Sequence, residues 1–311
     1  MGFKSIKKMR GALKGMSTVL VRDKDRLCMS SDNFISQLYQ SPQFLELTDV
    51  RTRIDFLTHY FLGKPYINNP QGEGADGEFD QAPLYRFDGF DCVTFVNNVL
   101  ALAISKNLSE FQKNLLRMNY YESIPKFENR FHFMSLDWNP QNQKNKIVRD
   151  VTAEILDEKN NCIAEIAEGE IDKPNWFLKK AENESPNRAA MLHRYAKQFK
   201  KTIARIPYLP LTKLFDEKKN PCVEIFNQIP HASIIEIVRP NWNLKDKIGT
   251  NLHVSHLGFS IRKPSSELFF RHASSEQKCV VEVLLSDYLK NVLESPTIKG
   301  IHAQEILLNI I

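Results

Sequence analysis

Cysteine is scarce in this chain, and long apolar runs are missing from it. The five cysteines (Cys28, Cys92, Cys162, Cys222 and Cys279) include no CxxC pair, which disfavours a structural zinc site or a thioredoxin-like motif. The four cysteines other than Cys92 permit disulfides without requiring them. No stretch reaches the roughly 18 consecutive apolar residues of a membrane-spanning helix. We therefore expect no membrane span and leave the redox compartment open.

Strong charge is also missing. The formal net charge is +5 over 311 residues, a mild excess that fits anionic small substrates and falls short of a nucleic-acid-binding signature. Basic residues near the N-terminus are followed only by the short apolar run Val19-Leu20-Val21. This run is too short for the hydrophobic part of a secretory signal. The protein is thus expected either to be cytoplasmic or to have lost a signal segment.

The length permits one decorated domain with a large core. Residues 1–30 have no periodic pattern and are expected to form an N-terminal arm. Residues 31–311 are expected to form a single α+β domain, because helical periodicity dominates 31–120 and strand-like alternation dominates 231–285. Residues 121–230 are interpreted as an insertion between these two parts.

Several helices are expected from caps and periodicity. Asp32 and Thr48 are candidate N-caps for helices that reach Tyr39 and Phe61, and a capping box at Ser109 predicts a helix through Met118. Ser185-Pro186 predicts a helix to about Arg205. That helix would carry a basic stripe, for which a solvated face and a binding surface are both open. The stripe consists of Arg194, Lys197, Lys201 and Arg205.

The stretch YRFDGFDCVTFVNNVLALAIS, residues 85–105, organises the chain. Its apolar residues recur at helical spacing from Cys92 onward, and Asp91 precedes them as a candidate N-cap. Cys92 would then lie in the first turn of a buried helix. The helix dipole and free N–H groups there favour a thiolate and could hold an oxyanion. The alternative is that Cys92 is an ordinary buried apolar residue.

Two strand patterns follow much later, VSHLGFSI and LFFRHAS, separated by a turn around Pro264. In a hairpin centred on Pro264, His256 and His272 would lie directly opposite each other on one face, close enough for their rings to hydrogen-bond. His253 would point to the other face because of its odd offset from His256, which excludes a zinc site built on that pair. A zinc pair from His256 and His272 would need a further ligand, and each histidine could also be a core residue.

A cysteine at a helix start, a strand histidine and a second histidine beside it match the components of a cysteine-hydrolase triad. Three segments carry a more specific resemblance: FDC opening an apolar helix, SHLGF on a strand, and HAS on the next strand. Together they resemble the NlpC-type papain-like peptidoglycan hydrolases. With RFHFMSLDW and IPHASIIEIVRPN, the ordered set is similar to a bacterial amidase-like branch long catalogued as a domain of unknown function.

The resemblance implies a papain-like fold in which a nucleophile helix packs on a mostly antiparallel sheet, with an added N-terminal helical region. It implies an N-acetylmuramoyl-L-alanine amidase with Cys92 as nucleophile, His256 as general base and His272 orienting it. Other residues are assigned to oxyanion or substrate contacts. These are Tyr85, Asp91, Arg130, Asp137 and Trp138.

Other functions stay open at this stage. The same triad would serve a γ-D-glutamyl-diamino acid endopeptidase or an acyltransferase, and a silent muropeptide-binding module would need no reactive cysteine. The resemblance implies a monomer that acts on peptidoglycan or muropeptides without a metal or cofactor. It favours a periplasmic or secreted location, with recycled cell-wall fragments as the reason to keep the cytoplasm open.

Overall fold

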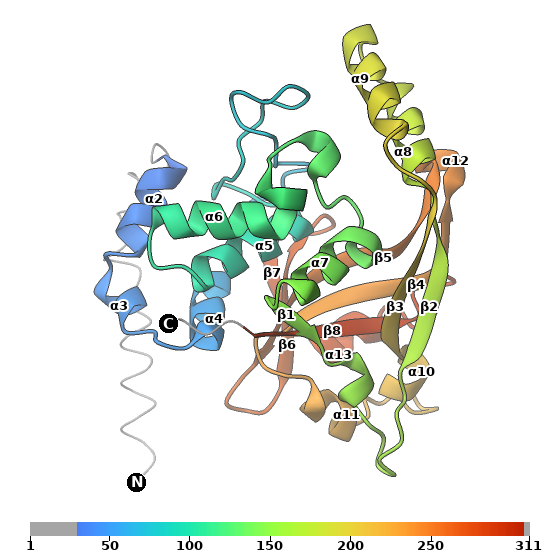
Figure 1. Cartoon of the computed structure of the whole chain (residues 1–311). Helices are drawn as coiled ribbons and strands as arrows, with labels where there is room; N and C mark the ends of the chain where they lie inside the picture. The colour runs from blue at the N-terminus through green and yellow to red at the C-terminus, as the bar shows by residue number, and fades with distance from the viewer. Residues whose placement is uncertain (1–29, 308–311) are drawn as a thin grey trace.

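A large antiparallel sheet with helices on both faces makes up the structure, a computed structural model that describes residues 30–307 (Figure 1). The expectation of a mixed α+β fold with a mostly antiparallel sheet is confirmed. The strands are β1 (Val148–Asp150), β2 (Glu165–Ile171), β3 (Thr202–Pro210), β4 (Ile234–Leu244), β5 (Thr250–Arg262), β6 (Leu268–Ser274), β7 (Cys279–Leu284) and β8 (Gly300–Ile306).

Helices α2 to α7 precede the first strand in the sequence, and the other helices lie between strands. The α-helices are α2 (Ser31–Leu38), α3 (Pro42–Leu45), α4 (Val50–Tyr60), α5 (Cys92–Ala103), α6 (Leu108–Asn119), α7 (Asn139–Lys144), α8 (Lys173–Ala181), α9 (Pro186–Ala196), α10 (Leu211–Leu214), α11 (Val223–Gln228), α12 (Lys245–Ile248) and α13 (Leu285–Lys290). Three short 3₁₀ turns are η1 (Tyr121–Ser123), η2 (Phe127–Asn129) and η4 (Thr152–Glu154), and η3 (Met134–Trp138) is a π-helix.

The strand order in the sheet is β2-β3-β8-β4-β5-β6-β7, with β1 pairing beside β8. Strands from the middle and the end of the described chain therefore lie side by side. The strands outside residues 231–285 include β1, β2 and β3 from the expected insertion and β8 near the C-terminus. The alternation of residues 147–155 also predicted a strand, which is β1, whereas β2, β3 and β8 were not expected.

Two apolar cores lie on the opposite faces of this sheet. On one face, Phe95 and Val99 of α5 pack with Leu257 and Phe259 of β5. On the other face, Phe270 of β6 packs among residues of α10, α11 and α13. Alternation along β6 and along β5 from Leu257 onward explains this division, because neighbouring residues in a strand point to opposite faces. The α5 helix is therefore fixed against β5, where the histidines are.

The N-terminal helices follow the expected pattern with small shifts at their ends. Val50, Ile54, Leu57 and Phe61 are buried along α4, as the periodicity predicted. Its N-cap is Asp49 rather than Thr48. Ser30 caps α2 and Asn107 caps α6, so in both helices the capping side chain lies two residues before the expected one. The expected arm at 1–30 falls outside the described residues except for Ser30.

The predicted helix from Pro186 to Arg205 is wrong in its second half. Helix α9 ends at Ala196, and Arg205 lies in β3, where its side chain pairs with Glu168 of β2. The basic stripe therefore has no single helical face. Arg194 and Lys201 are exposed and pair with Glu78 and with Asp172. These contacts favour the solvated interpretation of the stripe.

The cysteines that the structure describes are all free thiols. Cys92, Cys222 and Cys279 are half-buried and Cys162 is exposed. Cys28 lies outside the described residues, so its pairing stays untested. Within residues 30–307 no helix is long and apolar enough to cross a membrane.

Candidate active site

Cys92 is the first residue of α5, as the sequence predicted. Asp91 is the N-cap: its carboxylate accepts a hydrogen bond from the Thr94 backbone N–H at 2.8 Å, and the Asp91 N–H donates to the Thr94 hydroxyl at 3.0 Å. This reciprocal capping box satisfies two backbone donors that a helix start would otherwise leave free. Asp91 is therefore a capping residue, and it fixes the backbone at the start of α5, where Cys92 lies.

The loop before Cys92 is held by a second contact. Phe90 exchanges backbone hydrogen bonds with the segment 65–67, donating to the Pro65 carbonyl and accepting from the Ile67 N–H, each at 3.0 Å. Gly89 allows this close approach, because a Cβ there would lie 2.5 Å from Ile67 and 2.7 Å from the Pro65 oxygen. The same pairing brings Tyr66 near Cys92, close enough for the two groups to interact electrostatically.

His256 on β5 and His272 on β6 are hydrogen-bonded, Nε2 to Nδ1, at 2.6 Å. Their rings are nearly perpendicular, with centroids 4.7 Å apart. The expected contact between the two rings is confirmed, but the expected register is wrong. Phe259 pairs with Arg271 and Ser260 with Phe270, so the hairpin is centred at 265 rather than at Pro264 and the two histidines are diagonal neighbours.

Gly258 makes this diagonal contact possible. A Cβ at position 258 would lie 2.7 Å from the His272 Cβ and 2.5 Å from the Arg271 carbonyl oxygen. The missing side chain leaves the space that the His272 ring uses to reach His256. Phe270 stacks on His272 with centroids 4.6 Å apart, and the Tyr288 ring lies 5.3 Å from it. The imidazole of His272 thus packs in a cluster with these two rings, which also contact each other at 5.1 Å between centroids.

Cys92 and His256 line one pocket of about 130 Å³. The Leu257 backbone N–H, next to His256, is close enough to Cys92 to lower the pKa of its thiol. The other residues that line the pocket come from α5, from the segment 131–135 and from β5. They are Val93, Phe131, His132, Phe133, Met134, Ser135, Leu252, His253, Val254, Ser255 and Leu257.

A β-bulge brings His253 into this pocket. On β4, Ile237 pairs with His256 while Val238 pairs with Val254, so one extra residue of β5 interrupts the alternation. The bulge interrupts the regular alternation on which the expected separation of His253 from His256 rested, and both residues line the pocket. Among residues 30–307, no group of three His, Cys, Asp or Glu side chains is arranged to hold a metal ion.

Burial decides the charge state around Cys92. The pKa of the Cys92 thiol is raised to about 12. Burial is the main cause and the neighbouring Asp91 charge adds to it, whereas nearby backbone N–H groups act in the opposite direction. Burial also lowers the pKa of His256 to about 4 and that of His272 to about 3. Burial therefore opposes the expected ionisation of the thiol and favours the neutral thiol and neutral imidazoles at pH 7.

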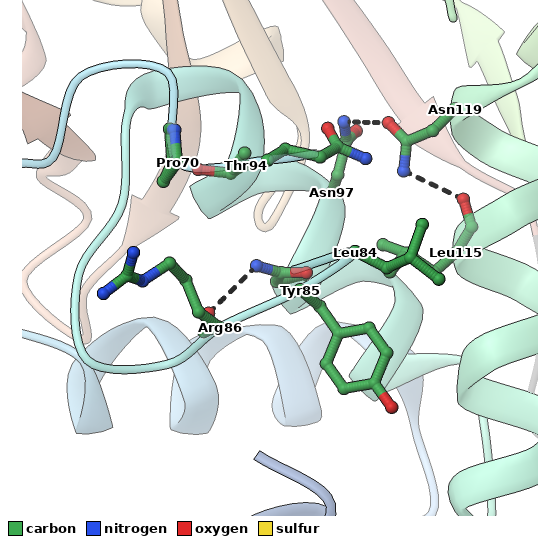
Figure 2. Close-up of a pocket in the computed structure, with 10 residues that line it drawn as sticks. Pro70, Leu84, Tyr85, Arg86, Thr94, Asn97, Leu115 and Asn119 are labelled. Atoms are coloured by element: carbon green, nitrogen blue, oxygen red, sulfur yellow. Dashed lines mark hydrogen bonds between the residues drawn. The ribbon is translucent and has the colours of Figure 1, made fainter. Parts of the chain in front are cut away.

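Tyr85 does not reach this pocket. Its hydroxyl donates to Asp32 at 2.6 Å and accepts from Gln112 at 2.7 Å. Figure 2 shows its ring pointing away from Thr94 in the first turn of α5. The expected oxyanion role of Tyr85 is therefore wrong, because its hydroxyl joins α2 to α6. Tyr66 and Tyr288 are the tyrosines near Cys92, and no sequence pattern singled them out.

Asp137 and Trp138 are buried structural residues rather than substrate contacts. Asp137 pairs with Lys173 at 3.0 Å and accepts from the Tyr121 hydroxyl at 2.9 Å. The Trp138 indole donates to the Asn97 side chain at 2.9 Å. Asn97 in turn contacts Asn119, a link drawn in Figure 2. Both residues were expected in the site, but their polar atoms are used inside the protein.

Arg130 lies behind the helix start. It donates to the Gln71 carbonyl at 3.1 Å, and its charge lowers the pKa of Asp91, which burial raises. Two of its buried nitrogens, Nε and Nη2, have no partner among the described residues. Its neighbours Phe131, His132 and Phe133 line the pocket, whereas Arg130 does not. Its contacts place it beside the N-cap of α5.

Comparisons with known proteins show which family the chain belongs to. The AmiA-like family model, described as N-acetylmuramoyl-L-alanine amidase-like, matches residues 56–298. The crystal structure of protein LPG0564 from Legionella pneumophila, of the DUF1460 family, is 40% identical with a TM-score of 0.85, over 90% of this chain and 95% of that chain.

A more distant match is an N-acetylmuramoyl-L-alanine amidase from Bacteroides uniformis, 22% identical with a TM-score of 0.58, over 83% of this chain and 99% of that one. At this identity it supports the fold alone. No curated protein matches the chain. The match over residues 56–298 covers most of the sequence, and the chain belongs to the AmiA-like, N-acetylmuramoyl-L-alanine amidase-like family.

Proposed function

We propose that this protein is a cysteine amidase that hydrolyses the bond between N-acetylmuramic acid and L-alanine in peptidoglycan fragments. The observation that carries the proposal is the shared pocket of Cys92 and His256, with His256 hydrogen-bonded to His272 at 2.6 Å. Family membership supports the amidase class. We further propose that α5 packed on β5 corresponds to the papain-like fold of NlpC-type hydrolases.

The hydrogen bond between the histidines prepares the base. When His256 donates from Nε2 to Nδ1 of His272, its own Nδ1 is free of a proton and can accept the proton of the Cys92 thiol. This tautomer puts the proton of His272 on its buried Nε2, which has no hydrogen-bond partner among the described residues, a cost that the proposed arrangement carries, and the hydrogen bond fixes the plane of the His256 ring. Because both groups are neutral at rest, the proton moves as the sulfur attacks, by general-base catalysis.

The attack forms a bond from the Cys92 sulfur to the amide carbonyl carbon, and the carbonyl oxygen becomes an oxyanion. The N–H groups at the start of α5 lower the pKa of the Cys92 thiol, so they already favour negative charge at this place. We assign the oxyanion contact to the Cys92 backbone N–H. Tyr66 replaces Tyr85 as its hydroxyl partner, because it lies near Cys92.

Collapse of this intermediate breaks the carbon–nitrogen bond. The imidazolium of His256 protonates the leaving alanine nitrogen, and the acyl group stays on Cys92 as a thioester. Water, deprotonated by the same imidazole, then attacks the thioester and releases the muramoyl carboxylic acid and the free thiol. No metal or cofactor takes part in this sequence.

The proposal extends to the setting of the reaction. We propose one catalytic domain spanning residues 31–311, acting as a monomer on muropeptides. A periplasmic or secreted location follows from the site of the substrate, and cytoplasmic recycling of cell-wall fragments is the other setting. Two rival functions on the same site are the γ-D-glutamyl-diamino acid endopeptidase and the silent muropeptide-binding module.

Mass spectrometry of defined muropeptides incubated with the protein tests which bond is cut. Release of a peptide that begins with L-alanine supports the amidase. Cleavage after D-glutamate would keep the cysteine chemistry and move the protein to the endopeptidases. If the muropeptide binds but is recovered intact, the binding module is the better description and the proposed reaction is wrong.

A further inference from the structure

The wall of the Cys92 pocket contains a second polar pair, Ser135 and His253. The Ser135 hydroxyl lies 3.0 Å from Nδ1 of His253. Both side chains are almost fully buried, at 5% and 2% exposure, and both line the pocket with Cys92 and His256. The proposed hydrolysis uses neither of them.

Ser135 is rigidly placed. It lies in the π-helix η3, a rare local geometry that is frequent at functional sites. The Asp137 carboxylate holds the start of η3 by accepting from the backbone N–H groups of His132 and Phe133, at 3.1 and 3.2 Å. Lys173 neutralises that carboxylate. The pair Asp137–Lys173 therefore fixes the position from which Ser135 reaches into the pocket.

The surroundings of His253 determine which group donates. Its Nε2 is buried without a partner among the described residues and faces Gly169, where a Cβ would lie only 2.8 Å away. An orphaned buried N–H is costly, so the proton belongs on Nδ1. Nδ1 then donates to the Ser135 oxygen. The hydroxyl hydrogen of Ser135 has no other acceptor among residues 30–307 and is free to donate to a ligand in the pocket.

The pocket is uncharged. None of the residues that line it is Asp, Glu, Lys or Arg. Burial lowers the pKa of its three histidines, His132, His253 and His256, so they are neutral at pH 7. A stem peptide carries carboxylates, which would find no cation here. The acyl side of the proposed substrate is a neutral sugar with an acetamido group, and a neutral group of this kind matches the uncharged lining of the pocket.

We propose that Ser135 is a specificity-determining residue that donates its hydroxyl hydrogen to the acetamido carbonyl of the muramoyl group, and that His253 is its positioning residue. This inference rests on the proposed function, since it names the part of that substrate which the pocket holds. It predicts discrimination between acylated sugars that differ only in the 2-acetamido group.

Binding to the Cys92→Ala protein tests the inference without turnover. The two probes are N-acetylmuramoyl-L-alanyl-D-isoglutamine and its analogue with a 2-hydroxyl in place of the acetamido group, measured by calorimetry. Adding Ser135→Ala should weaken the acetamido probe about five- to tenfold and leave the analogue unchanged. Adding Ser135→Thr, which keeps the hydroxyl, should preserve the discrimination. Equal weakening of both probes, or of neither, overturns the proposal.

Variants of His253 separate positioning from packing. His253→Leu should weaken binding of the acetamido probe selectively, as Ser135→Ala does. Leucine offers no N–H to the Ser135 oxygen, so the hydroxyl is no longer oriented. His253→Asn restores a donor near Nδ1 and should restore the selectivity. If Leu and Asn at 253 weaken both probes alike, His253 only fills space and its positioning role is overturned.

The outcome for the inference is distinguishable from the outcome for the reaction. If the wild-type protein releases no L-alanyl peptide while the Cys92→Ala protein still discriminates through Ser135, the reaction is wrong and the acetamido contact stands. If the peptide is released without Ser135-dependent discrimination, the reaction stands and this inference is overturned.

Discussion

At the scale of single residues, burial outweighs the helix terminus. The sequence placed Cys92 at the start of a helix, where the dipole favours a thiolate, and that position is correct. The structure adds what local sequence does not contain, namely the walls of the pocket and the adjacent Asp91 carboxylate. Both raise the thiol pKa, to about 12. The cysteine is thus a thiol, which in the proposed mechanism His256 activates.

The resting state predicts how Cys92 reacts with iodoacetamide. Alkylation requires the thiolate, and a thiol pKa near 12 leaves about a thousandfold less thiolate at pH 7 than an ordinary cysteine has. Cys92 should therefore react far more slowly at pH 7 than the exposed Cys162, and its rate should keep rising with pH beyond 9.

Peptide mapping after timed alkylation gives both rates from one sample, with Cys162 as the internal control. Faster labelling at Cys92 than at Cys162 at pH 7 would mean that a thiolate–imidazolium pair exists before substrate binds. That result would contradict the general-base step proposed here.

At the scale of elements, the histidine pair depends on the turn that sets the register. The alternation of β5 and β6 was visible in the sequence, so the two histidines could be placed on one face. The register of the two strands was not visible in the sequence, because it depends on the type of turn that joins them. The turn runs from Lys263 to Glu267, with Ser266 in the left-handed region at φ 69°. This geometry moves the centre of the hairpin one residue past Pro264.

Gly258→Ala tests this element. The added Cβ would be 2.7 Å from the His272 Cβ and 2.5 Å from the Arg271 carbonyl oxygen, so β5 and β6 must separate. We expect a loss of about 1–3 kcal/mol in the free energy of unfolding and a drop in kcat, because His272 no longer reaches His256. Urea unfolding and turnover of a muropeptide check the two effects.

Ser265→Ala, in the exposed turn of the same hairpin, is the matched control and should change stability by less than about 0.5 kcal/mol. If Gly258→Ala behaves like this control in both measurements, the close packing of His272 against position 258 is not what holds the pair.

At the scale of the whole molecule, segments distant in sequence complete the sheet. Strand β3 contains Pro207 and Pro210, residues that are unfavourable inside a strand, and the sequence of β2, EIAEGEI, has no regular alternation of apolar and polar residues. Both escaped prediction because their pairing partners, not their own composition, make them strands. The Ser135–His253 contact joins η3 to β5 across 118 residues. No local pattern contains such a contact.

The ionisation of Glu236 tests the packing of these segments. It is fully buried on β4 and accepts from Asn139 of α7 at 2.8 Å and from Gln304 of β8 at 3.3 Å. Asp150 and His302 are the titratable groups beside it. Burial raises the pKa of Glu236 to about 8, so between pH 4.5 and 8 the folded protein binds one more proton than the unfolded chain.

The sign of the resulting pH dependence follows from that extra proton. The contribution of protonated Glu236 to the free energy of unfolding is fully present below pH 4.5. It is lost as the pH rises through 8, and the total loss is on the order of a few kcal/mol. Glu236→Gln cannot ionise and should remove this part of the pH dependence, whatever constant cost the lost acceptor brings. Urea unfolding at pH 5 and pH 8 compares the two proteins, and an unchanged difference between the two pH values would refute the assignment.

The central claim is that Cys92 is the nucleophile, with His256 as its base and His272 as the residue that orients it. The direct measurement is the rate at which a defined muropeptide releases its L-alanyl peptide. Cys92→Ala should abolish release while thermal unfolding is nearly unchanged. His272→Ala should keep a residual rate, about 10²-fold below that of the wild-type protein. Full activity in Cys92→Ala would contradict the account.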